Sequence, residues 1–181
     1  GITKEQLHKD AMQAAHARSP VCLYDMEEVM AESIFSVKPE NLFNREEPLD
    51  IGFVPIYILT NQDKLNGASV SAQEGVLEKV AELLGTNYYV LPSSIHELLI
   101  LPDNGSMQLS ELEAMVREVN ATQVAPEDRL SDKVQYYDRE TELLQRGQEK
   151  SVLGRLSDKK AQLQQADHTA PKQPHRSEVS L

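Results

Sequence analysis

The stretch TNYYVLPSSIHELLILP, residues 86–102, is the densest apolar run in the sequence, and it decides the predicted fold. Residues 88–91 and 97–101 are typical of two short strands, joined by a turn at Pro92-Ser93-Ser94-Ile95. Residues 98–101 are apolar without alternation, a pattern that indicates a strand covered on both faces. Helices must provide that cover, so the hairpin predicts a sheet with helices packed on it.

Capping signals and apolar periodicity predict four helices around this hairpin. Thr3 begins the first helix, which the Ser19-Pro20 pair ends, and Asp25 begins the second, which ends before Pro39. The third and fourth are expected at 72–84 and 111–120, with Ser71/Glu74 and Ser110/Glu113 as capping boxes. Gly85 is the expected left-handed residue after the third helix.

Two further segments read as strands. The apolar pattern of residues 51–60 predicts the first strand of the sheet, buried on both faces. Pro55 lies within this strand and lacks a backbone N–H, which indicates a sheet edge at that point. Residues 133–146 predict a hairpin around the turn 138–140. The fold class is therefore α+β: a small mixed sheet with a β-α-β-β-α core and packed helices, a C-terminal β-hairpin extension and a disordered tail.

The composition divides the chain into three parts. Residues 1–125 are expected to form the globular domain, 126–149 an extension with the hairpin, and 150–181 a disordered polar tail. Residues 1–125 hold 19 acids and 8 bases, so they carry the whole formal net charge of −11. An acidic domain repels phosphate backbones, which argues against nucleic-acid binding.

Several absences in the sequence indicate the compartment. Cys22 is the single cysteine, which excludes an internal disulfide and fits a reducing, cytoplasmic environment. No window approaches the roughly 18 apolar residues of a membrane span, and no signal peptide is recognisable. The chain starts at Gly1 without an initiator Met, so we expect a fragment that lacks an N-terminal part.

The turn in the central hairpin holds the candidate catalytic residues Ser93, Ser94, His96 and Glu97. A serine near a histidine could form a nucleophile and base. However, His96 and Glu97 are adjacent in an extended segment and point to opposite faces, and Ser94 lies roughly 6–7 Å from His96 along a strand. The sequence therefore favours the interpretation that the serines satisfy turn backbone groups.

The loop at 61–69 holds the candidate ligand-binding residues Asn61, Asn66, Gly67 and Ser69. A loop that leads from a strand into a helix can present amide groups to an anion. The alternative is a plain Asn66-Gly67 turn, because no phosphate-binding glycine motif is present.

No cofactor and no metal site are expected. His8 and His16 lie eight residues apart on the first predicted helix, about 80° off a common face, and so cannot bind one metal ion together. His168 and His175 fall in the predicted tail.

Three segments carry a resemblance to a known family: PIYILTNQDKLNGAS, EGVLEKVAELLGTNYYVLPSSIHELLILP and MVREVNATQVAPEDRLSDKVQYYDRE. Together they resemble a bacterial family catalogued as domain of unknown function 5688, common in Firmicutes and often carried on integrated conjugative elements. The likeness spans about residues 1–146 and would correspond to the C-terminal two thirds of a member. It implies a cytoplasmic bacterial protein and assigns no activity, cofactor or catalytic residue.

The expected function is that of a non-enzymatic protein-interaction accessory of a mobile or conjugative element. An unidentified protein is the expected partner, a homo-oligomer stays open, and neither a membrane nor nucleic acid is expected. The alternative is a small-molecule-binding or hydrolytic enzyme that uses the 61–69 loop and the 92–97 turn. That alternative requires the sheet to bring the two segments together.

Overall fold

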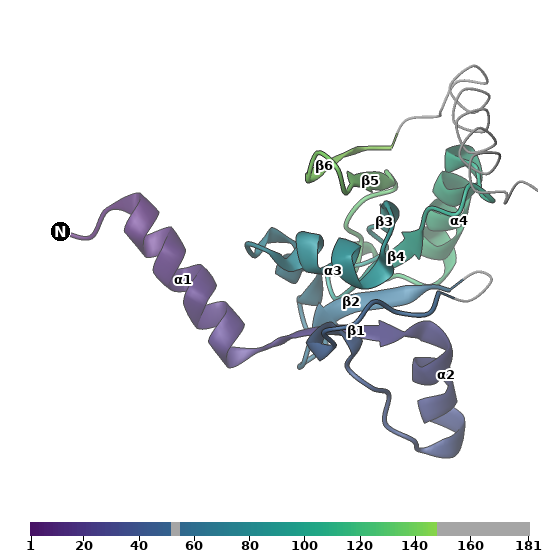
Figure 1. The fold of residues 1–181 in the computed structure, drawn as a ribbon, viewed down its shortest axis with the longest axis horizontal. Coiled ribbons are helices and arrows are strands. Elements are labelled where there is room, and N and C mark those ends of the chain that lie inside the picture. Colours follow the sequence, from purple (N-terminus) through teal and green to yellow (C-terminus); the bar gives the residue numbers. More distant parts are fainter. Residues whose placement is uncertain (52–54, 148–181) are drawn as a thin grey trace, which may run out of the picture. The chain divides into compact units, whose positions relative to one another are not determined.

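The computed structural model describes residues 1–51 and 55–147, without the side chains of 12–13 and 15–18. Its centre is a six-stranded sheet in the order β1-β2-β4-β3-β5-β6 (Figure 1). The strands are β1 (Val21–Asp25), β2 (Tyr57–Asn61), β3 (Tyr88–Leu91), β4 (Leu98–Pro102), β5 (Gln135–Asp138) and β6 (Leu143–Arg146). The α+β class is confirmed. Every neighbouring pair is antiparallel, so the expectation of a mixed sheet is wrong.

The helices are α1 (Lys4–Arg18), α2 (Met26–Phe35), α3 (Val76–Leu84) and α4 (Leu109–Thr122), with short 3₁₀ turns η1 (Leu42–Asn44), η2 (Gly67–Ala72) and η3 (Pro126–Asp128). All four predicted helices occur among the described residues. The caps of α1 and α2 form as expected, since Thr3 accepts from the Gln6 N–H and Asp25 from the Glu27 N–H. Ser36 ends α2 in the left-handed region.

The central hairpin is covered on both faces, as the unbroken apolar run predicts. Leu98 and Ile100 of β4 belong to the core cluster that contains Val80 and Leu84 of α3. The next residues along the strand, Leu99 and Leu101, belong to the second cluster with Leu112 and Val116 of α4. Because successive strand residues point to opposite faces, α3 and α4 cover opposite sides of the sheet.

The starts of α3 and α4 differ from the predicted ones. η2 occupies residues 67–72, and α3 begins only at Val76 after Gly75, which has φ +78°. Gly75 takes the place of the expected Ser71/Glu74 box because a left-handed residue is needed between the two helical segments. α4 begins two residues early with Gln108 and Glu111 as its capping box. Gly85 has φ +68° and ends α3 as predicted.

The sequence analysis missed β1. Residues 21–25 pair with β2 along its whole length, so β2 lies inside the sheet. Pro55 precedes β2 and marks no edge, which corrects the earlier interpretation. The predicted strand at 51–60 is shorter than expected, and its residues 52–54 lie outside the described residues.

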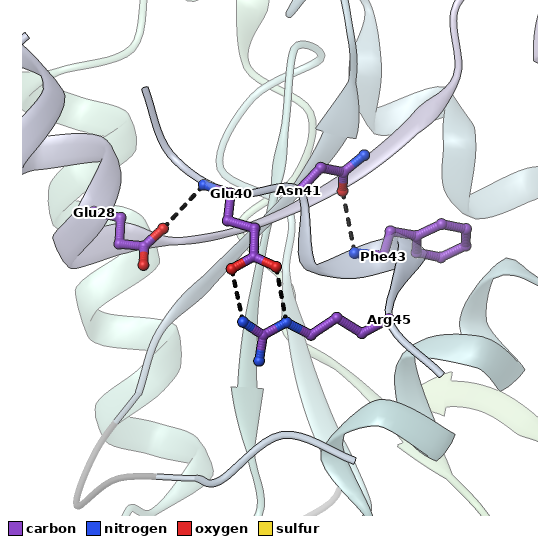
Figure 2. A network of polar contacts seen from close by, with 5 residues as sticks. All are labelled: Glu28, Glu40, Asn41, Phe43 and Arg45. Atoms are coloured by element: carbon purple, nitrogen blue, oxygen red, sulfur yellow. Dashed lines mark hydrogen bonds and ion pairs between the residues drawn. The ribbon is translucent and has the colours of Figure 1, made fainter. Parts of the chain in front are cut away.

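The side chain of Asn41 closes the outer edge of β1. Its Oδ1 accepts from the Leu23 N–H at 3.0 Å, and its Nδ2 donates to the Val21 carbonyl at 3.1 Å. The segment that carries Asn41 is itself fixed (Figure 2): Glu28 of α2 accepts from the Glu40 N–H, and the Glu40 carboxylate pairs with Arg45. Asn41 therefore supplies the hydrogen bonds that a seventh strand would make there.

The predicted C-terminal hairpin is present as β5 and β6, and it is joined to the sheet. β5 pairs with β3, which places Tyr137 against Tyr88 with ring centroids 5.0 Å apart, and Tyr136 against Tyr89 at 5.1 Å. Val134 adds to the cluster under α4. The expected disordered tail at 150–181 lies outside the described residues.

Candidate functional site

The sheet brings the 61–69 loop and the 92–97 turn into direct contact. The Ala68 N–H donates to the Ile95 carbonyl at 3.1 Å, and the Thr60 hydroxyl donates to the His96 carbonyl at 2.8 Å. Gly67 lies so close to His96 that a Cβ there would meet the His96 carbonyl. The two segments considered together in the sequence analysis therefore form one junction.

His96 lies at the centre of this junction, with both ring nitrogens in use. Its Nδ1 accepts from the Asn66 N–H at 3.1 Å, so in the neutral ring the proton resides on Nε2. Nε2 lies 3.4 Å from Asp128 Oδ1 of η3, and the carbonyl of Asp128 accepts from the Ile95 N–H at 2.8 Å. His96 thus joins three chain segments and has no free nitrogen lone pair for a general base.

Asp128 was not found from the sequence. It lies 32 residues after His96 and follows Pro126 in a segment with no strand or helix periodicity. Nothing in the local pattern indicates that η3 returns to the 92–97 turn, so only the tertiary structure reveals this partner.

The other candidate catalytic residues, Ser93, Ser94 and Glu97, are part of the turn and the approach to β4, and the two serines take part in hydrogen bonds of the turn. The Ser94 hydroxyl accepts from the His96 backbone N–H at 3.1 Å, which is the turn role favoured by the sequence. Ser93 is buried, and its N–H donates to the Leu91 carbonyl at 3.0 Å. Glu97 is half-buried at the approach to β4. Among the described residues, the His96 ring nitrogens lie against the Asn66 N–H and Asp128, and no serine hydroxyl bonds to them.

The candidate ligand-binding residues hold the loop itself in shape. The Asn61 side chain donates to the Leu65 carbonyl at 2.9 Å and accepts from the Leu65 N–H at 3.2 Å. The Ser69 hydroxyl donates to the Asn66 carbonyl at 2.7 Å, and Asn66 has φ +53°. The N–H groups of Leu65, Asn66 and Ala68 are all bonded within the protein, so they are not available to an anion.

The expectation that this loop opens a helix is also corrected. The 3₁₀ turn η2 begins at Gly67 within the loop, and α3 starts only at Val76. The loop therefore does not present amides at the amino end of an α-helix, which was the physical basis for an anion site.

A separate hollow, which the sequence did not indicate, lies beside the end of β4. It is lined by Pro55, Tyr89, Leu101, Pro102, Asp103, Asn104, Ser106, Met107 and Leu112. At its rim the Tyr136 hydroxyl donates to Asp103 at 2.8 Å and accepts from Asn87 at 3.0 Å. Burial and the bond to Asp103 raise the pKa of Tyr136.

Several large apolar side chains are exposed on and directly after α2. No residue of α2 is buried, and Met30, Ile34, Phe35 and the following Val37 are exposed by 64%, 74%, 70% and 65%. We call these four side chains the α2 patch. Glu27, Glu28 and Glu32 lie on the same helix, so acidic groups accompany the apolar ones.

Among the described residues, no group of three or more histidine, cysteine or acidic side chains could hold a metal ion. Within the same residues, no helix is both long and apolar enough to cross a membrane. Cys22 is buried, with its sulfur beside the Asn41 amide at 3.3 Å.

These features define an α+β protein with an antiparallel sheet and a formal net charge of −11, in which α2 exposes large apolar side chains. Residues 1–139 match the Family of unknown function (DUF5688), and the chain belongs to that family. No curated protein matches the chain. No solved structure matches it either.

Proposed function

We propose that this chain is a non-enzymatic protein-interaction accessory in the bacterial cytoplasm, and that the α2 patch is its contact surface. The carrying observation is that α2 has no buried residue and that three of its large apolar side chains, together with the following Val37, are exposed. Single exposed apolar residues are normal on a protein surface, whereas several that lie together mark an interaction site. Met30 and Ile34 are four residues apart and so share one face of α2. The resemblance to a family often carried on conjugative elements supports a role as an accessory of such an element.

The charge of the chain indicates what kind of partner would fit. The formal net charge is −11, and three glutamates share α2 with the patch. A matching surface would place apolar side chains against the patch and Lys or Arg at the rim, because opposite potentials steer two proteins together. The partner is therefore a protein with an apolar, basic-rimmed surface.

The test compares three forms of the full chain as bait in a bacterial lysate: wild type, Ile34→Ser/Phe35→Ser, and Ile2→Ser/Leu7→Ser. The control pair lies on or beside α1 and is similarly exposed, at 74% and 62%. Truncating two interface anchors costs about 2–4 kcal/mol, which weakens binding by roughly 30- to 1,000-fold.

A captured protein is then purified and titrated against all three forms at two salt concentrations. We expect binding that is weakened only by the α2 substitutions and that falls as salt rises. Equal binding to all three forms, or equal loss from both variants, would exclude the α2 patch as the contact surface.

The alternative function is a small-molecule or hydrolytic site at the junction of the 61–69 loop and the 92–97 turn. Its support is that the two segments touch, as the alternative requires. The evidence against it is that His96 Nδ1 accepts from the Asn66 N–H and Nε2 lies beside Asp128, so neither ring nitrogen has a lone pair for a general base. Turnover of any substrate that disappears in Ser94→Ala and His96→Gln, both shown to be folded, would establish this function in place of the interaction role.

A further inference from the structure

The sequence contains two Asn-Gly pairs, Asn66-Gly67 and Asn104-Gly105, and the fold holds them differently. In such a pair the glycine backbone nitrogen is able to attack the side-chain amide of the asparagine, because glycine has no Cβ to block the approach. The reaction closes a five-membered ring, so the peptide that joins the two residues must rotate. The surroundings of each peptide therefore decide which pair reacts.

The Asn66-Gly67 peptide is fixed within the His96 junction. The Asn66 carbonyl accepts from the Ser69 hydroxyl at 2.7 Å and from the Ser69 N–H at 3.2 Å. Gly67 is buried, and a Cβ there would meet the Thr60 hydroxyl and the His96 carbonyl. Rotation of this peptide would break both bonds and press Gly67 into its neighbours, so the fold protects Asn66.

The Asn104-Gly105 peptide lies in the turn between β4 and α4, and both of its residues are exposed. Gly105 has φ +72°, and nothing lies within 4 Å of a Cβ placed there. The preceding residue, Asp103, is held to the sheet: its N–H donates to the Asn87 carbonyl at 2.8 Å, and its Oδ2 accepts from the Tyr136 hydroxyl at 2.8 Å. The space around Gly105 therefore allows the peptide to rotate while Asp103 stays in place.

The groups that assist this reaction surround the exposed pair. The Gly105 N–H donates to Asp103 Oδ1 at 3.1 Å, so a carboxylate is in place to receive the proton that the attacking nitrogen loses. Asn104 Oδ1 accepts from the Ser106 N–H at 3.0 Å and also from the Ser106 hydroxyl. Two donors at this oxygen stabilise the negative charge that develops on it when the nitrogen adds to Cγ.

We propose that Asn104 is a site of spontaneous conversion to aspartate and isoaspartate. The Gly105 nitrogen forms a bond to Cγ of Asn104, and its proton passes through Asp103 to the side-chain nitrogen. The bond between Cγ and that nitrogen breaks, ammonia leaves, and a succinimide ring remains. Water then opens the ring at one of its two carbonyl carbons, which gives aspartate or isoaspartate. This proposal is independent of the α2 patch.

The conversion changes both the charge and the backbone ahead of α4. Either product replaces a neutral amide with a carboxylate next to Asp103, in a chain whose formal net charge is already −11. Isoaspartate also routes the main chain through the former side chain, shortly before Met107 and Leu109, which pack against the cluster under α4. An exposed isoaspartyl residue is the class of substrate that protein isoaspartyl methyltransferases modify, so such an enzyme would act on the converted chain.

The experiment follows both pairs in the full chain during incubation near neutral pH, in buffer and in a denaturing concentration of guanidinium chloride. Trypsin separates the two sites, because Asn66 falls in the peptide 65–79 and Asn104 in the peptide 80–117. Mass spectrometry measures the gain of about 1 Da, and labelling by an isoaspartyl methyltransferase measures isoaspartate. In the folded chain Asn104 should convert at least about tenfold faster than Asn66, because Asn66 reacts only after the junction opens. In the unfolded chain the two rates should be similar.

Two variants test the groups around Asn104. Ser106→Ala removes one of the two donors to Asn104 Oδ1 and should slow conversion in the folded chain by about three- to tenfold. Asp103→Asn removes the carboxylate but keeps an acceptor for the Tyr136 hydroxyl, and it should slow conversion by about the same factor. Ser69→Ala is the matched control and should leave the rate at Asn104 unchanged.

Three results would overturn the proposal. The first is an Asn104 that stays unmodified in the folded chain, and the second is an Asn66 that converts there equally fast. The third is a rate at Asn104 that neither Ser106→Ala nor Asp103→Asn lowers, or that both lower equally in the unfolded chain, since the fold would then contribute nothing to the reaction.

Discussion

Gly67→Ala is the sharpest test of the junction between the 61–69 loop and the 92–97 turn. A Cβ at this position would press against the Thr60 hydroxyl and the His96 carbonyl and would lie 2.9 Å from the Asn61 backbone nitrogen. Two of these three contacts are backbone atoms, which cannot rotate away. The substitution must therefore separate the two segments or distort them.

The expected cost follows from the contacts that are lost. Overpacking of a close contact costs about 1–3 kcal/mol, and loss of the Thr60–His96 hydrogen bond adds about 1 kcal/mol. The free energy of unfolding should thus fall by about 2–4 kcal/mol. With a urea m-value of about 2 kcal/mol/M, the unfolding midpoint should fall by about 1–2 M.

The assay is equilibrium urea unfolding of the full chain, followed by far-ultraviolet circular dichroism because the chain has no Trp. Gly75→Asn is the matched control: Gly75 has φ +78°, which Asn tolerates, and nothing lies within 4 Å of a Cβ there. We expect the control to cost less than about 1 kcal/mol. A Gly67→Ala variant as stable as the control would refute the close packing of the junction.

Three further predictions concern polar groups in the sheet. Asn41→Ala removes the side chain that closes the β1 edge, and it should lower the free energy of unfolding by about 2–3 kcal/mol in the same urea assay. An unchanged urea midpoint would show that water replaces the two hydrogen bonds of Asn41 at no cost. Tyr137→Phe should be neutral or stabilising, because its buried hydroxyl has no hydrogen-bond partner among the described residues, whereas Tyr88→Phe should cost about 1 kcal/mol through loss of its bond to the Leu77 carbonyl. The opposite ranking in urea would contradict the assigned contacts. Burial raises the pKa values of Tyr88 and Tyr136 above 10.0, so above about pH 10 the folded state keeps phenolic protons that the unfolded state loses. The free energy of unfolding should therefore be full below about pH 10 and fall above it by up to about 1.4 kcal/mol per pH unit for each tyrosine. Tyr136→Phe should make this decline shallower.

The elements with local signals were predictable from the sequence. The 86–102 hairpin was recognisable because its strands are adjacent in the chain and its apolar residues do not alternate. α1 and α2 carry side-chain caps within a few residues of their first turn. The start of α3 was not predictable in this way, since Ser71 and Glu74 form a plausible box that the 3₁₀ turn η2 displaces.

The elements that depend on distant partners were not predictable. β1 is five residues long and begins directly after a helix stop, so it reads as a connection until its pairing with β2 is known. Asn41 has no local pattern that marks it as the cover of a strand edge 18 residues away. The contact between the 61–69 loop and the 92–97 turn could not be predicted from the sequence, and neither could the approach of Asp128 from η3 to His96.

The sequence by itself determined the α+β class, the helices and the covered central strands, because caps, periodicity and unbroken apolar runs act over a few residues. Only the tertiary structure decided the strand order, the antiparallel pairing, the His96 junction and the closure of the β1 edge by Asn41. Those features arise from hydrogen bonds and packing between segments tens of residues apart, and such pairings leave no periodic trace in a single sequence.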